Sequence, residues 1–230
     1  PTDEPKFNLF YLNPKAFSGF TKKSRNILWF VNNDLNEFKL MENPFSKPQI
    51  VVKSSFEDND IHEFYFKENV NLIINSILRN ERKEKLRRIN KSLSRSKDLE
   101  NRFGIKLKYP SAYKTVKDTS NFIWIQKKIQ KGHMNIVSYS IPIKDFKSFS
   151  RKRIISIRDS IGKLYIPGRL KESYMITEKA YKPFFYKSKK ENKTLYITKG
   201  TWEVYNDFMA GPFINFFIED INNKRWIVIE

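Results

Sequence analysis

The densest chemistry in this sequence is a run of cationic side chains at residues 79–97. Only two carboxylates, Glu81 and Glu84, interrupt it. Ammonium and guanidinium groups at this density attract phosphate, on nucleic acid or on lipid headgroups. The run therefore predicts an anionic-surface site, whose candidate residues are Arg79, Arg82, Lys83, Arg87, Arg88, Lys91 and Arg95.

A helix is the element that would position these charges. Leu86, Ile89 and Leu93 recur at three- and four-residue steps within the run, which indicates an inward-facing stripe with cations on the other faces. A basic rod of this kind could bind nucleic acid or an anionic membrane. A third explanation stays open: Lys, Asn, Ile and Phe all have AT-rich codons, so genomic base composition alone could supply the excess of lysine.

The other reactive side chains do not form a recognised catalytic or metal motif. Glu57, Asp58 and Asp60 resemble a helix-capping turn more than a calcium loop, since they lack the glycine and terminal glutamate of an EF-hand. His62 and His133 are far apart in sequence and lack the spacing of a helical zinc site. We therefore predict no catalytic, cofactor-binding or metal residue and no cofactor, and the sequence gives no positive reason to propose an enzyme.

Composition places the chain among globular proteins. Its 230 residues are 40% hydrophobic and 15% aromatic, and the net charge is +19. There is no cysteine, so disulfides and cysteine nucleophiles are excluded within these residues. No apolar run is long enough to span a membrane as a helix. The chain begins at Pro1 without methionine, so we expect a fragment or a processed product.

The first part of the chain predicts three strands and a long helix. Strands are expected at residues 7–12, 26–31 and 49–53. Asp60 is a candidate N-cap with Glu63 three residues later, and Ile61, Phe64 and Tyr65 begin the expected apolar stripe of the helix.

The second part predicts the same order, followed by more strands. Strands are expected at 105–108, 121–126 and 134–141, and Ile154, Ile157 and Ile161 indicate a shorter helix. Six further short strands are expected at 174–177, 184–186, 195–199, 202–205, 213–219 and 225–230. They indicate an antiparallel C-terminal β-meander, with a turn at Asn222-Asn223.

Two segments of the chain repeat one pattern. The first is Asn13-Pro14-Lys15-Ala16-Phe17, followed by Trp29. The second is Tyr109-Pro110-Ser111-Ala112-Tyr113, followed by Trp124. This predicts an internal duplication of a strand-strand-strand-helix unit, with a first unit at 1–98 and a second unit plus the meander at 99–230. The predicted fold class is α+β, mostly antiparallel sheet with one long basic helix and one shorter helix.

Several blocks, in order, resemble a known family. They are Arg87-Arg88-Ile89-Asn90-Lys91-Ser92-Leu93, Tyr109 to Tyr113, Ile157 to Lys163, Tyr165 to Arg169, Ser173 to Glu178, Lys199 to Val204 and Phe208 to Phe213. Together they resemble an uncharacterised family of Bacteroidota envelope lipoproteins, domain of unknown function four-eight-three-seven. The resemblance implies a periplasm-facing protein of the bacterial cell envelope, tethered to the membrane by a lipidated N-terminus that lies before this chain. It implies no activity, substrate or catalytic residue.

These observations favour a non-catalytic structural or interaction domain of the cell envelope. Its expected partners are envelope proteins or an anionic membrane surface, and no small-molecule ligand is predicted. A nucleic-acid-binding protein that uses helix 79–97 is the alternative, and a hydrolase acting on an envelope polymer is a weaker one.

Overall fold

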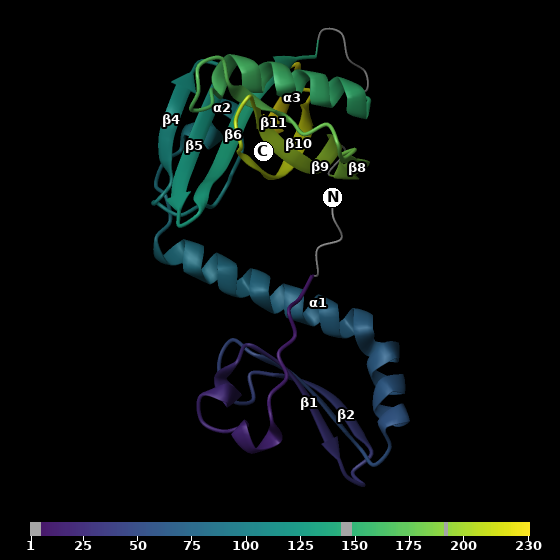
Figure 1. Cartoon of the computed structure of the whole chain (residues 1–230). Helices are drawn as coiled ribbons and strands as arrows, with labels where there is room; N and C mark the ends of the chain where they lie inside the picture. The colour runs from purple at the N-terminus through teal and green to yellow at the C-terminus, as the bar shows by residue number, and fades with distance from the viewer. Residues whose placement is uncertain (1–5, 144–148, 191–192) are drawn as a thin grey trace. The chain divides into compact units, whose positions relative to one another are not determined.

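The computed structural model describes residues 6–143, 149–190 and 193–230, and it divides them into two compact units (Figure 1). One unit is Lys6–Leu93. The other contains Ser94–Glu230. Every strand pair lies within one unit, so each unit has a sheet of its own.

The unit Lys6–Leu93 is a small mixed sheet with one long helix. Its strands are β1 (Asn26–Asn32), β2 (Glu37–Glu42) and β3 (Ile50–Phe56), in the spatial order β1-β3-β2. β1 runs parallel to β3, and β2 runs antiparallel to it. The central strand β3 is buried at six of its seven positions. Two short 3-10 turns precede the sheet, η1 (Pro14–Ala16) and η2 (Thr21–Lys23).

Helix α1 (Asn59–Lys91) begins two residues earlier than the predicted N-cap implies. Asp58, not Asp60, is the N-cap: its Oδ1 accepts a hydrogen bond from the Asp60 backbone N–H at 2.8 Å. The buried side chains are His62, Ile73, Ser76 and Glu84, whereas Ile61, Phe64 and Tyr65 are exposed. The predicted apolar stripe is therefore wrong at its start, because the Ser54 hydroxyl of β3 pairs with the imidazole Nδ1 of His62 at 2.7 Å and so places His62 against the sheet.

The second unit is an eight-stranded antiparallel sheet with two helices. Its strands are β4 (Lys114–Thr119), β5 (Phe122–Ile129), β6 (Gly132–Pro142), β7 (Tyr174–Thr177), β8 (Phe184–Lys190), β9 (Lys193–Tyr205), β10 (Ala210–Asp220) and β11 (Arg225–Ile229). The order is β4-β5-β6-β11-β10-β9-β7, and β8 pairs with β9. The helices are α2 (Asp98–Phe103) and α3 (Arg151–Tyr165).

Two apolar clusters cover opposite faces of this sheet. Phe122, Phe217 and Trp226 belong to the cluster that packs with Ile154 of α3. Ile123 of β5 and Ile227 of β11, adjacent in sequence to members of the first cluster, belong to the second, which packs with Leu99 and Phe103 of α2. Alternation along each strand therefore divides the core between the two helices. Figure 1 shows α3 lying along one face of the sheet.

The α+β class, the mostly antiparallel sheets and the C-terminal run of strands are confirmed. The predicted strands at 7–12 and 105–108 are wrong, since neither segment is a strand. The strands predicted at 195–199 and 202–205 form one continuous strand, β9, which passes through Gly200. β2, β4 and α2 were not predicted.

The predicted duplication is not a duplication of fold. Both units have three strands followed by a helix, but the topologies differ: β1 and β3 pair in parallel, whereas β4, β5 and β6 form an antiparallel meander. Trp29 and Trp124 are both half-buried, yet Trp29 is on an edge strand and Trp124 is on an inner one. The shared sequence pattern reflects similar local structure, a turn before a strand, and does not determine how the strands pair.

Candidate functional site

Six of the seven candidate residues lie on α1 and one does not. Arg79, Arg82, Lys83, Arg87, Arg88 and Lys91 lie on the last four turns of the helix. Arg95 follows the end of α1, in the segment that leads to α2 in the other unit. Leu86 is 43% exposed and Leu93 is 39% exposed, so the inward stripe predicted for this run is wrong.

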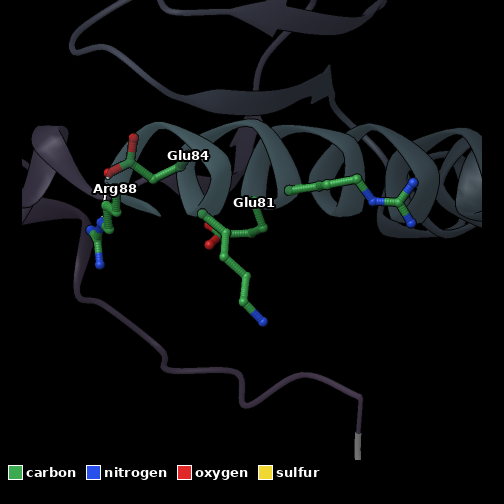
Figure 2. A pocket seen from close by; sticks show the side chains of 5 residues that line it. Glu81, Glu84 and Arg88 are labelled. Carbon is green, nitrogen blue, oxygen red and sulfur yellow. Dashed lines mark hydrogen bonds and ion pairs between the residues drawn. The ribbon is translucent and has the colours of Figure 1, made fainter. Parts of the chain in front are cut away.

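Some of these cations already form ion pairs with carboxylates of the same unit. Glu84 accepts hydrogen bonds from Arg87 Nε at 2.6 Å and from Arg88 Nε at 2.7 Å, and its side chain is only 5% exposed. Figure 2 shows Glu84 and Arg88 close together on one side of the helix, with Glu81 further along it. Glu81 accepts from Arg25 Nε at 2.9 Å and from Asn26, so it fastens α1 to the start of β1.

These ion pairs determine how the site responds to acid. The hydrogen bonds from Arg87 and then Arg88 lower the pKa of Glu84 from 4.5 to about 2. A depressed carboxylate pKa means that the stabilisation is fully present above the ordinary pKa and is lost as the pH falls toward 2. Glu84 therefore keeps its negative charge across the neutral range.

On the α1 part of the run, four cations remain exposed and without an ion pair within the described part of the chain, as do Arg95 and Lys97 beyond the end of the helix. The four on α1 are Arg82, Lys83, Lys85 and Lys91. Arg82 and Lys85 are three residues apart and share one face, and Lys83 and Lys91 lie eight residues apart on another. Arg79 has a weak pair, since its Nη2 lies 3.9 Å from Glu42.

A shallow depression of about 390 Å³ lies beside this part of the helix. Its lining is wholly charged: Glu81, Arg82, Glu84, Lys85 and Arg88 (Figure 2). Small-molecule sites are mostly apolar and enclosed, with a few polar groups that fix orientation. This depression is open and is lined by residues of one helix, so it does not have the enclosed form of a small-molecule site.

A second polar constellation is buried beneath α3. Arg158 is 1% exposed, and its Nε and Nη2 donate to the carboxylate of Glu230 at 2.8 and 2.7 Å. Its Nη1 donates to Thr177 Oγ1 at 3.0 Å, and its guanidinium lies 3.9 Å from the ring centroid of Phe213. Asp159 accepts from both the N–H and the hydroxyl of Thr177 at 2.7 Å.

Two further side chains of the sheet complete this constellation. Asn215 Nδ2 donates to Glu230 at 3.0 Å. Burial raises the pKa of the Tyr139 hydroxyl far above its usual value, and the negative charge of Glu230 raises that pKa further. Tyr139 is thus a neutral phenol, unsuited to act as a nucleophile. The arrangement joins α3 to β7, β10 and β11, and we interpret it as a structural clamp. The sequence shows Arg158-Asp159-Ser160 as reactive side chains, but only the fold brings Glu230 to Arg158.

The acidic and histidine residues that the sequence offered as candidates have capping, packing or exposed surface positions. Asp58 caps α1, His62 contacts Ser54 between the rings of Phe30 and Phe56, and His133 lies exposed near the start of β6. Among the described residues, no group of three His, Asp or Glu side chains could hold a metal ion. None of the described helices has the length and apolar character that crossing a membrane requires.

The fold and the candidate site define an α+β protein with a basic helix in one unit and a buried arginine clamp in the other. Residues 92–230 match the family model described as Domain of unknown function (DUF4837). Since this match covers more than half of the chain, the chain belongs to that family. Residues 1–90 match a second model, Domain of unknown function (DUF8532). No curated protein and no solved structure matches the chain.

Proposed function

We propose that this chain is a non-catalytic interaction domain of a bacterial cell-envelope lipoprotein, and that α1 binds an anionic phospholipid surface. The observation that carries the proposal is the state of the cations on the last four turns of α1. Glu81 and Glu84 are already engaged by arginines, so Arg82, Lys83, Lys85 and Lys91 keep uncompensated, exposed charges. Charges of this kind are free to pair with phosphate.

The magnitude of the effect follows from surface electrostatics. A lysine or arginine near an anionic leaflet contributes roughly 1 kcal/mol, and the contribution falls off within a Debye length. Because Arg82 and Lys85 share one face of α1 and Lys83 and Lys91 another, one pair contacts the leaflet directly and the other pair adds a smaller contribution, since it lies farther from the surface. The extra charges elsewhere on the chain add a long-range attraction that is not specific to α1.

The test is binding of the whole chain to vesicles of equimolar phosphatidylcholine and phosphatidylglycerol. Arg82→Gln/Lys83→Gln/Lys85→Gln/Lys91→Gln should weaken binding at least about tenfold and flatten its dependence on salt. The matched control removes four exposed lysines of the other unit, Lys128→Gln/Lys131→Gln/Lys171→Gln/Lys179→Gln, and changes the net charge equally. Equal loss in both variants would show a general charge effect and would contradict a role for α1.

The envelope location is supported only by the family resemblance of the sequence, and it has its own measurement. The full-length protein should fractionate with membranes and resist extraction by salt but not by detergent. Release into the soluble fraction by salt alone would contradict a lipid tether. Tighter binding to duplex DNA than to anionic vesicles would favour the nucleic-acid alternative instead.

A further inference from the structure

A cluster of large apolar side chains near the start of the unit Lys6–Leu93 is open to water. Leu9, Phe10 and Tyr11 are 81%, 91% and 90% exposed, and Phe20 is 88% exposed. Residues 7–12 lie outside every helix and strand. Three of these side chains are consecutive in sequence, and several exposed large apolar side chains in one short segment indicate an interaction site.

The turn that carries Phe20 is attached firmly to the sheet. Phe17 packs on Trp29 with ring centroids 5.0 Å apart, and Phe45 lies 5.9 Å from Phe17. The Thr21 hydroxyl donates to the Ala16 carbonyl and accepts from the Ser18 N–H, which closes the turn around residues 16–21. Phe20 is therefore held outward by a turn whose neighbouring aromatic side chain is anchored.

The charges within residues 6–23 are all positive, although Asp3 and Glu4 precede this segment in the sequence. No aspartate or glutamate occurs from residue 5 to residue 33, whereas Lys6, Lys15, Lys22 and Lys23 all lie there. Arg25, the remaining cation, is paired with Glu81. Exposed apolar side chains with lysines beside them are complementary to a surface that is apolar inside and anionic outside.

We infer that residues 6–23 form a bilayer-insertion segment, in which Leu9, Phe10, Tyr11 and Phe20 enter the interface of an anionic phospholipid membrane. Tyrosine and phenylalanine partition well at the headgroup level, and the exposed Lys6, Lys15 and Lys23 would reach the lipid phosphates, whereas Lys22 packs over the rings of Phe17 and Phe45. The inference rests on the proposed function for the nature of the surface, and it adds an apolar contact that α1 does not supply.

Two other occupants fit the segment less well. Single-stranded nucleic acid would stack its bases on aromatic rings, but Leu9 and Leu12 offer no ring. A second copy of the chain in a two-fold interface would bring the lysines of one segment against those of the other, and like charges facing each other are destabilising.

The test places a fluorophore at residue 10. Because the chain has no cysteine, Phe10→Cys can be labelled at that position alone with an environment-sensitive dye. On vesicles of equimolar phosphatidylcholine and phosphatidylglycerol, its emission should shift to shorter wavelength and become quenchable by a quencher attached to the acyl chains. The matched control is Phe208→Cys, since Phe208 is fully exposed but follows Asp207 in the other unit. The control dye should show neither change.

A binding measurement on unlabelled protein completes the test. Leu9→Gln/Phe10→Gln/Tyr11→Gln should weaken vesicle binding at least about tenfold, because three apolar side chains no longer leave water. Phe208→Gln should leave binding unchanged.

The outcomes separate this inference from the proposed function. Vesicle binding without a shift at residue 10 overturns insertion and leaves the α1 surface standing. A shift that survives unchanged in the α1 quadruple variant, with unchanged affinity, supports insertion and contradicts the role of α1. A dye response caused by oligonucleotide alone, or by self-association at constant lipid, assigns the segment to another occupant and overturns the inference.

Discussion

Arg158 is the centre of a buried polar network in the second unit. Its side chain is almost fully buried, and it bonds Glu230, Thr177 and the ring face of Phe213 at once. A buried ion pair stabilises little relative to an apolar replacement, because both charges lose their hydration. Removing one partner is a different matter, since the other charge then remains buried without compensation.

The residue-scale prediction is that Arg158→Met destabilises the chain by about 3–5 kcal/mol, because Glu230 loses its partner. The double variant Arg158→Met/Glu230→Gln should recover a substantial part of that loss, since no buried charge is then left unpaired. Urea unfolding at neutral pH measures both. If the double variant is no more stable than the single one, desolvation of Glu230 is not the cause.

At the scale of elements, α3 lies unusually close to β7, and one glycine permits this. A Cβ on Gly162 would lie 2.1 Å from the backbone carbonyl oxygen of Met175, a distance that only a shift of the helix or strand could relieve. The same approach lets Arg158 reach Thr177, and it brings the Met175 N–H to the Ile166 carbonyl at 3.0 Å. The Arg158 clamp and the close packing of α3 on β7 at Gly162 thus both depend on the same position of α3.

The element-scale prediction is that Gly162→Ala lowers stability by about 1–3 kcal/mol, although alanine favours helix more than glycine does. The matched control is Lys152→Ala, at an exposed position of the same helix, which should change stability by less than about 0.5 kcal/mol. Thermal unfolding of both variants decides the point. A stabilised Gly162→Ala would show that α3 can move away from β7 without loss.

At the scale of the whole molecule, the chain divides its backbone pairing completely between two sheets. All strands of the three-stranded sheet lie in residues 26–56, and all strands of the eight-stranded sheet lie in residues 114–229. The two family models also meet close to this division, at residues 90 and 92. No strand of one sheet requires a strand of the other.

The corresponding prediction is that residues 94–230, expressed alone, fold into a stable β-rich domain. They hold both apolar clusters of the larger unit and the whole Arg158 clamp. Far-UV circular dichroism and a single cooperative unfolding transition would verify it. An unfolded fragment would mean that the larger sheet depends on contacts from residues 6–93.

Local pattern was sufficient for the elements that carry strong periodicity. α3, β5, β6 and the C-terminal strands were predictable, since capping residues and alternating apolar positions act over a few neighbours. The long helix was also predicted, although its N-cap is Asp58 and its buried side chains differ from the predicted apolar stripe. The basic run was equally visible, as was its helical setting. β4 was not, because it is an edge strand whose positions are mostly polar and exposed. β2 was missed although Phe38 and Leu40 alternate with Glu37 and Lys39, since the strand is short and lies at the sheet edge.

Only the tertiary structure decided which partners these elements take. Strand pairing joins residues far apart in sequence, so the parallel pair β1–β3 and the adjacency of β6 and β11 have no local signal. The buried stripe of α1 likewise depends on Ser54 and the sheet that receives His62. The same holds for charge: sequence alone counts the cations of α1, but the positions of Arg25, Glu81 and Glu84 in space determine which of them remain free to bind.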